Sequence, residues 1–147
     1  MPQFQGSGFT LTLPSGCHDA SAYTFVLPAD GGFAANLVIR FEDVAADLDL
    51  AQYADKALSN LSGQFQGFKL VNKVAGKRGD ADGVLATVEW GEGPARMTQK
   101  HVYLLTPGKK ARLYILTTTD LAANAAKSNP VFDQILRSFA PNEAQRF

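Results

Sequence analysis

Residues 84–118 are VLATVEWGEGPARMTQKHVYLLTPGKKARLYILTT, and this stretch decides the fold class. It holds three apolar or alternating segments, at 84–90, 98–106 and 112–118, which are separated by short connections rich in glycine, proline and charge. Alternation with a period of two is typical of strands, and connections of this length join antiparallel neighbours. A parallel sheet would need a helical crossover between successive strands. The stretch therefore predicts an antiparallel sheet.

Further strands are predicted on the N-terminal side of this stretch. Residues 68–74 form one candidate directly before it, and three more lie at 9–13, 22–27 and 36–41. The three N-terminal segments follow one another closely, which favours a meander. In total we expect a twisted antiparallel sheet of about six to seven strands.

Two other segments have the period of a helix. Apolar residues recur every three or four positions through residues 50–65, and Asp49 stands where it can cap this helix, with Gln52 able to reach back to the cap. A second helical region is predicted after Asp120, with Pro130 in the first turn of its last segment. We expect an α+β fold in which both helices cover one face of the sheet and leave part of the other exposed.

The composition is that of one globular domain. The chain has 147 residues, of which 46% are hydrophobic, and 14 basic residues balance 14 acidic ones. This length fits a single domain, residues 1–147, with a core of its own. No basic excess points to nucleic acid, and no apolar run is long enough for direct membrane insertion.

The cysteine count and the N-terminal segment bear on the compartment. Cys17 is the only cysteine, so the chain forms no internal disulfide. Residues 1–6, MPQFQG, have neither a basic nor an apolar region of the kind found in secretory signals. We therefore expect a cytoplasmic protein.

No constellation of catalytic or metal-binding residues stands out. Cys17 lies beside His18, but neighbouring side chains point apart and no third group orients them; the other histidine, His101, lies inside a predicted strand. Paired histidine or cysteine spacings for a metal are absent, and three aspartates within residues 43–49 fit a loop and helix cap better than a calcium loop. We expect neither an enzyme nor a bound cofactor.

The glycine-rich connections do not have the strand-to-helix context of phosphate-binding loops. Residues 76–83 lie between two predicted strands and include Arg78-Gly79-Asp80, the tripeptide of adhesive ligands. A hairpin turn explains these three residues better, because glycine and aspartate are typical turn residues.

One strand carries a candidate binding set. Gln99, His101 and Tyr103 alternate with Val102 and Leu104, so the two sets face opposite sides of the strand. Polar side chains that both donate and accept, among apolar neighbours, fit the lining of a groove for a peptide or helix. A half-buried strand with a solvated outer face has the same pattern, so both interpretations stay open.

Several strings resemble the DcrB-like family, and the match extends over nearly the whole chain. Those strings are FTLTLP at 9–14, NLVIR at 36–40, the helix 53–61 leading into GFKL at 67–70, and the strands 99–105 and 113–119. Within that family, the segment TQKHVYLL at 98–105 is most similar to the Eag chaperones of type VI secretion systems.

The resemblance implies a PsbP- or Mog-like fold and a homodimer. In these chaperones the sheet holds the N-terminal transmembrane helices of a toxic effector, shields them from water and helps to load the effector onto its spike protein. Transferred to this chain, with two residues added from the strand pattern, the implied effector-binding positions are Ala22, Thr24, Leu37, Ile39, Gln99, His101 and Tyr103.

Two other classes of function remain as alternatives. A general protein-interaction module of the PsbP or Mog type, without a membrane-segment client, would present a polar surface, and an apolar lining near Ile39 would distinguish the two cases. A small enzyme or ligand carrier would need a closed pocket with convergent polar groups, and the sequence indicates no such set.

Overall fold

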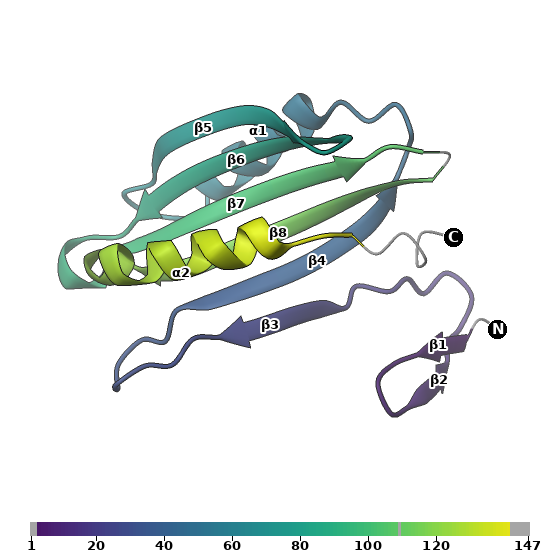
Figure 1. Cartoon of the computed structure of the whole chain (residues 1–147), viewed down its shortest axis with the longest axis horizontal. Coiled ribbons are helices and arrows are strands. Elements are labelled where there is room, and N and C mark those ends of the chain that lie inside the picture. Colours follow the sequence, from purple (N-terminus) through teal and green to yellow (C-terminus); the bar gives the residue numbers. More distant parts are fainter. Residues whose placement is uncertain (1–2, 109, 142–147) are drawn as a thin grey trace.

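The structure is a computed structural model that describes residues 3–108 and 110–141. Its elements confirm the predicted α+β class: two α-helices pack on a six-stranded antiparallel sheet, and a small two-stranded sheet stands apart (Figure 1). In chain order the elements are β1 (Gln3–Gln5), β2 (Thr10–Thr12), β3 (Ala22–Val26), β4 (Asn36–Val44), α1 (Leu50–Ser62), β5 (Lys69–Arg78), β6 (Ala81–Trp90), the 3-10 turn η1 (Gly93–Ala95), β7 (Met97–Thr106), β8 (Ala111–Leu121), the 3-10 turn η2 (Ala122–Asn124) and α2 (Ala125–Ser138).

The six-stranded sheet has the order β3-β4-β8-β7-β6-β5, and every neighbouring pair is antiparallel. The predicted connection 76–83 is shorter than expected, because β5 and β6 remain paired as far as Arg78 opposite Ala81. Only Gly79 and Asp80 form the turn, and Gly79 adopts a φ of 61°, which a residue without Cβ reaches at little cost. The hairpin-turn explanation of this tripeptide is therefore confirmed.

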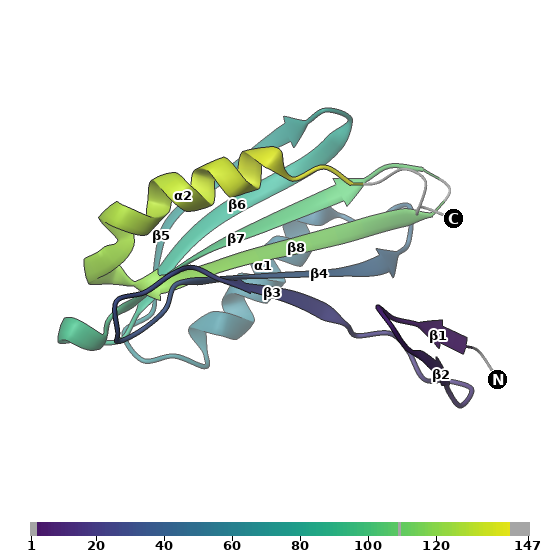
Figure 2. The ribbon, with the colours of Figure 1, turned by 60° about the horizontal axis from the view of Figure 1, so that its bottom comes forward.

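The two helices lie on opposite faces of the sheet (Figure 2). Helix α1 packs through Leu50 and Ala54 onto the face that includes Leu113, whereas α2 packs through Phe132 onto the face that includes Leu37. We call these the α1 face and the α2 face. The expectation that both helices cover one face was wrong.

The central strand β8 explains why both faces are covered. Leu113 and Ile115 point toward α1 and Tyr114 and Leu116 toward α2, and all four side chains are buried. A strand that is apolar at every position needs cover on both sides, unlike one with a clean alternation. The unbroken apolar run LYIL therefore requires a helix on each face.

The predicted cap of α1 is present, although its geometry differs from a capping box. The side chain of Asp49 accepts a hydrogen bond from the backbone N–H of Gln52 at 3.1 Å. This satisfies one of the free donors of the first turn. Pro130 does not lie in a first turn, because α2 already begins at Ala125.

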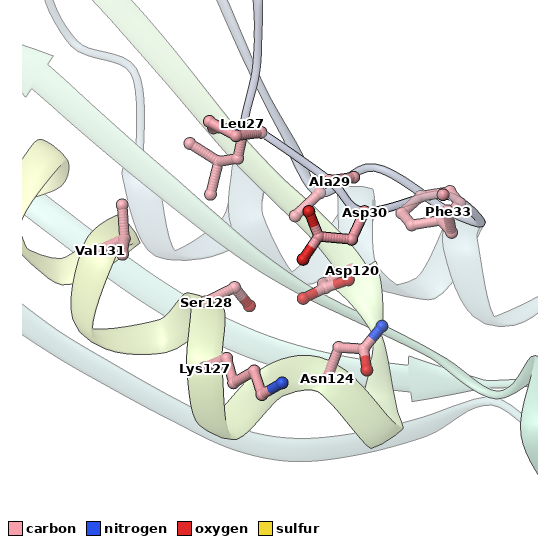
Figure 3. A pocket seen from close by; sticks show the side chains of 12 residues that line it. Leu27, Ala29, Asp30, Phe33, Asp120, Asn124, Lys127, Ser128 and Val131 are labelled. Atoms are coloured by element: carbon pink, nitrogen blue, oxygen red, sulfur yellow. The ribbon is translucent and has the colours of Figure 1, made fainter.

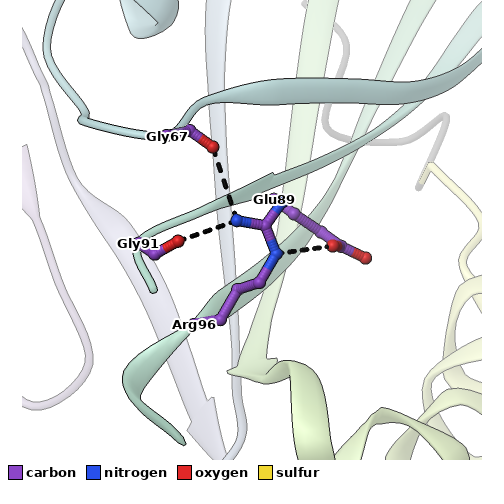
Figure 4. A network of polar contacts seen from close by, with 4 residues as sticks. All are labelled: Gly67, Glu89, Gly91 and Arg96. Carbon is purple, nitrogen blue, oxygen red and sulfur yellow. Dashed lines mark hydrogen bonds and ion pairs between the residues drawn. The ribbon is translucent and has the colours of Figure 1, made fainter. Parts of the chain in front are cut away.

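Arg96 joins the end of β6 and two connections at one corner of the sheet (Figure 4). Its Nε donates to Glu89 at 2.9 Å, and one terminal nitrogen donates to the carbonyl oxygens of Gly91 at 2.7 Å and Gly67 at 3.4 Å. Gly67 has a φ of 68°, and a Cβ there would lie 3.2 Å from the carbonyl oxygen of Gly91. The segment that follows α1 is thereby held against the end of β6.

The predicted strand at 9–13 does not join the large sheet. Its central part, β2, pairs with β1, a strand that the sequence patterns did not predict. Phe4 and Phe9 contact each other with ring centroids 5.9 Å apart, but Phe9 and Leu11 remain about half exposed. The hairpin lies beyond the beginning of β3 in both views (Figures 1 and 2), so the first strand of the predicted meander is separate.

No helix formed by residues 3–108 and 110–141 combines the length and the apolar character that a membrane crossing requires.

Candidate functional site

Part of the α1 face extends past helix α1 toward the edge strand β3, and its side chains are small. Strand register places Thr24 beside Val38, Val38 beside Thr117, and Thr117 beside His101. The apolar contacts of α1 are instead with β6, β7 and the part of β8 that contains Leu113 and Ile115. Six of the side chains that α1 leaves uncovered form what we name the open strip, and they are Ala22, Thr24, Val38, Thr117, Thr119 and Gln99. The exposed Arg40 borders the open strip on the same face, beside Ala22.

Gln99 is held in place where the open strip meets the part of the sheet under α1. Its side-chain nitrogen donates to Thr119 Oγ1 at 2.9 Å, and its oxygen lies 2.9 Å from His101 Nε2. His101 is only 7% exposed, and burial, with a smaller effect of Arg40, lowers its pKa from 6.5 to about 4. The imidazole is therefore neutral near pH 7. Gln99, His101 and Thr119 form a hydrogen-bonded set that we call the polar row, and this row adds no charge to the open strip.

Tyr103, in contrast, lies beneath α1. Its ring meets that of Tyr53 edge-on, with centroids 6.0 Å apart, and only 2% of Tyr103 is exposed. The Tyr53 hydroxyl donates to Glu42 at 2.8 Å, and burial followed by this bond raises the pKa of Tyr53 to about 12. Burial also raises the pKa of Tyr103. Tyr103 thus belongs to the contact between helix and sheet.

Leu37 and Ile39 are separated from the other predicted positions. Both point to the α2 face, where Leu37 is 1% exposed within the core and Ile39 packs against the same cluster. Side chains on a strand alternate, so the residue of β4 that faces the strip is Val38. The structure therefore brings together Ala22, Thr24 and Gln99, with His101 at the border, and excludes the two β4 positions.

We expected one open apolar side of the sheet, but the exposed side chains of the two faces differ in size and polarity. The open strip has small and hydroxyl side chains, whereas large exposed apolar residues flank α2 on the other face. Tyr23 and Phe25 of β3 are 60% and 54% exposed, and Val74 and Leu85 border a shallow hollow of about 250 Å³ between β5, β6 and β7. The two faces therefore offer two different kinds of surface.

Cys17 and His18 are both exposed in the loop between β2 and β3. In the part of the chain that the structure describes, no three side chains of histidine, cysteine, aspartate or glutamate gather as a metal site.

Comparison with known proteins gives one family match and several matches in fold. The family model described as DcrB matches residues 9–138. No curated protein matches the chain by sequence.

Three solved structures are similar over most of their length. Protein PA94 of Pseudomonas aeruginosa, a protein of unknown function, has a TM-score of 0.76 and 24% identity, with 97% of both chains covered. LpqN, involved in cell envelope biogenesis of Mycobacterium tuberculosis, has a TM-score of 0.59 and 12% identity over 80% of this chain and 82% of its own. The cyanobacterial PsbP of Synechocystis sp. PCC 6803 has a TM-score of 0.52 and 12% identity over 90% and 99%. These likenesses show a shared fold, and the predicted PsbP-like architecture is confirmed.

Proposed function

Because this chain belongs to the DcrB family, we propose that it is a cytoplasmic chaperone or adaptor for a type VI secretion effector. It binds the N-terminal transmembrane segments of the effector, shields them from water and aids loading onto the spike protein. The family and the PsbP-like fold support the coarser part of this proposal, a module that binds other proteins. The open strip supports the finer part.

The side chains of the open strip fit the surface of a transmembrane helix. Helices pack in membranes against small residues, which allow close approach, and against hydroxyl and amide groups, which hydrogen-bond across the contact. The strip supplies Ala22, three threonines, one valine and Gln99, which are uncharged, and Arg40 lies at its border beside Ala22. An apolar helix of about 20 residues cannot stay exposed in water, so such a surface would hold it before insertion.

Gln99 is the polar contact that this model uses most directly. Its amide nitrogen carries two N–H groups, and among the described residues only Thr119 accepts from it. The second N–H is therefore left for a carbonyl or hydroxyl oxygen of the bound helix. The contact with His101 fixes the other end of the amide, so its orientation costs little on binding.

The size of the strip favours a dimer. Four strands at a spacing of about 4.8 Å give a width of about 14 Å, whereas a membrane-spanning helix is about 30 Å long. One strip covers about half of such a helix, so two copies of the chain would be needed to cover it. We therefore expect a solution mass of twice 15.8 kDa by light scattering.

Co-expression with the N-terminal apolar segment of a type VI effector tests the proposal, the effector being chosen from the genes that neighbour this one. The segment should be soluble and should co-purify with the wild-type chain. Thr24→Glu places a charge on the open strip and should lower the amount co-purified by about tenfold, which corresponds to about 1.4 kcal/mol. Tyr23→Glu is the matched control, because it changes the neighbouring residue on the other face of the same strand.

The same pair of variants identifies the alternative function. If Tyr23→Glu abolishes co-purification and Thr24→Glu does not, the exposed apolar residues beside α2 carry the interaction. The chain would then be a general interaction module without a membrane-segment client. A segment that stays soluble without this protein would contradict the chaperone role altogether.

A further inference from the structure

A pocket of about 470 Å³ lies between the loop that joins β3 to β4 and the beginning of α2 (Figure 3). It is on the α2 face and thus on the opposite side of the sheet from the open strip. Its apolar wall comes from Leu27, Phe33, Ala35 and Val131. Its polar side chains converge from the β3–β4 loop, β8, η2 and α2, and are Asp30, Asp120, Asn124, Lys127 and Ser128.

Asp120 is the most enclosed acidic group of this pocket. It is 4% exposed, and its Oδ1 accepts a hydrogen bond from the backbone N–H of Leu121 at 2.7 Å. Among residues 3–108 and 110–141, no lysine, arginine or histidine nitrogen lies within 4.0 Å of its carboxylate. A buried carboxylate without a counter-charge is costly, so a ligand that brings one gains binding energy there.

Ser128 gives a second and independent indication of a ligand. It is 7% exposed, and its Oγ is buried with no hydrogen-bond partner among the described residues. A serine inside a helix commonly bonds to the carbonyl of the preceding turn, which this one does not do. In Figure 3 the hydroxyl points toward Asp120 and into the pocket. The hydroxyl is therefore free to contact a molecule in the pocket.

The charges decide which kind of ligand fits. A helix N-terminus such as that of α2 ordinarily favours an anion. Here two carboxylates, Asp30 and Asp120, outnumber the single ammonium of Lys127, and the Asp30 side chain is directed toward Asp120 (Figure 3). An anion would be repelled at short range, whereas a cation would pair with both carboxylates.

We propose that this pocket binds an organic cation, an ammonium or guanidinium group on a short alkyl chain. The cationic group donates to the carboxylates of Asp120 and Asp30, and Ser128 Oγ accepts one further N–H. The alkyl chain lies against Leu27 and Val131. The cation is carried by a free amine or by a lysine or arginine side chain of a partner protein, and the two sources share this chemistry.

Titration of the full chain with three small probes of similar shape tests the assignment. n-Butylammonium should cause saturable shifts of the backbone amide signals of Gly31, Asn124 and Ser128 in ¹⁵N-correlated NMR spectra. n-Butanol should bind at least about tenfold more weakly, and butyrate should not saturate the site. If butyrate binds more tightly than n-butylammonium, or if the cation gives no saturable shift, the proposal is wrong.

Two variants locate the binding within the pocket. Asp120→Asn keeps an oxygen that can accept from Leu121 and removes the charge, so it should weaken n-butylammonium by about tenfold or more. Ser128→Ala should weaken it by a smaller factor, and Asp47→Asn, at an exposed loop position, should leave it unchanged. Equal affinity in Asp120→Asn and the wild-type chain, with both spectra those of a folded protein, would overturn the assignment.

Two further probes distinguish the sources of the cation. Agmatine represents a free amine, and a tripeptide with blocked ends and a central lysine represents a protein side chain. Binding of agmatine alone assigns the pocket to a small molecule, and binding of the tripeptide assigns it to a partner protein. If neither shifts the three amide signals, neither source supplies the cation and the proposal is wrong. Because Thr24→Glu lies on the other face, its effect on effector binding is independent of this result.

Discussion

The two faces of the six-stranded sheet are built from alternate residues of the same strands, yet they differ in chemistry. On the α2 face, Leu37, Leu116 and Phe132 form a core of large apolar side chains. On the α1 face, α1 covers only part of the sheet, and the remainder holds the uncharged side chains of the open strip, with Arg40 at its border. The difference shows that alternate residues of the same strands can build a packed apolar core on one face and leave uncharged side chains uncovered on the other.

The comparison also separates two kinds of binding. The open strip is broad and has no charged member, so it fits an extended apolar partner such as a helix. The pocket beside α2 is enclosed by Asp30, Asp120 and apolar neighbours, so it fits a small charged group. Each face can therefore be changed by mutation with little effect on the other, since additivity holds for distant sites.

The largest expected effect comes from emptying the core of the α2 face. Phe132 is 2% exposed, so Phe132→Ala should lower the free energy of unfolding by about 3–5 kcal/mol. Val131, its neighbour on α2, is 43% exposed, so Val131→Ala should cost about 0.5 kcal/mol or less. Urea denaturation of both variants measures the difference. Similar costs would mean that α2 does not anchor this face.

The second effect is a pH dependence of the free energy of unfolding, which comes from His101 on the α1 face. Burial lowers the pKa of His101 to about 4, so below pH 6.5 the unfolded chain takes up a proton that the folded chain does not. The stabilisation is complete above about pH 6.5 and is lost as the pH falls toward 4, by up to about 3 kcal/mol.

Denaturation between pH 7 and pH 4 of the wild-type chain and His101→Gln measures this contribution. The stability difference between the two proteins should shrink or reverse toward pH 4, and His18→Gln, at an exposed loop position, should follow the wild-type curve. Parallel curves for the wild-type chain and His101→Gln would contradict the burial of a neutral imidazole.

A smaller effect is expected from Gln99, at the border of the open strip. Gln99→Leu leaves Thr119 Oγ1 and His101 Nε2 without their partner and should lower the free energy of unfolding by about 1–2 kcal/mol. Gln134→Ala, at an exposed position of α2, is the control and should change it by about 0.5 kcal/mol or less. Thermal denaturation compares them. An unchanged midpoint for Gln99→Leu would show that the polar row is not held together as described.

The smallest effect should be a gain in stability. Ser128→Ala removes a buried hydroxyl that has no partner among the described residues, so it should raise the free energy of unfolding by up to about 1 kcal/mol. Ser138→Ala, which removes a hydroxyl that donates to the carbonyl of Ile135, should not be stabilising. A loss of stability in Ser128→Ala in the absence of ligand would mean that the hydroxyl is already satisfied.

Local sequence patterns predicted most of the elements. The turn at Gly79 and Asp80 and the cap at Asp49 depend on interactions within a few residues, and both are present. Strand β1 was missed because its three residues have no pattern of their own and are ordered by pairing with β2. The second helical region begins after Asp120 as predicted, but no new segment starts at Pro130, because this residue lies within α2.

The candidate sites depended on relations that no single segment contains. Of the predicted effector-binding positions, Ala22, Thr24 and Gln99 lie on the α1 face, whereas Leu37 and Ile39 lie on the α2 face and their neighbour Val38 faces the open strip. A change of one position along a strand moves a side chain to the other face, and the resemblance did not fix that position. The pocket was not foreseen, because Asp30, Asp120 and Ser128 come from a loop, a strand and a helix far apart in sequence.

The antiparallel strands, their short turns and the two amphipathic helices could be read from the amino-acid order alone, because they follow from side-chain period and turn chemistry over short distances. Only the tertiary structure decided which face each helix covers, which residue of β4 faces the open strip, and that polar groups converge beside α2. Those features depend on strand register and on packing between segments that are far apart in the chain, where burial of the apolar run 113–116 on both sides outweighs local preference.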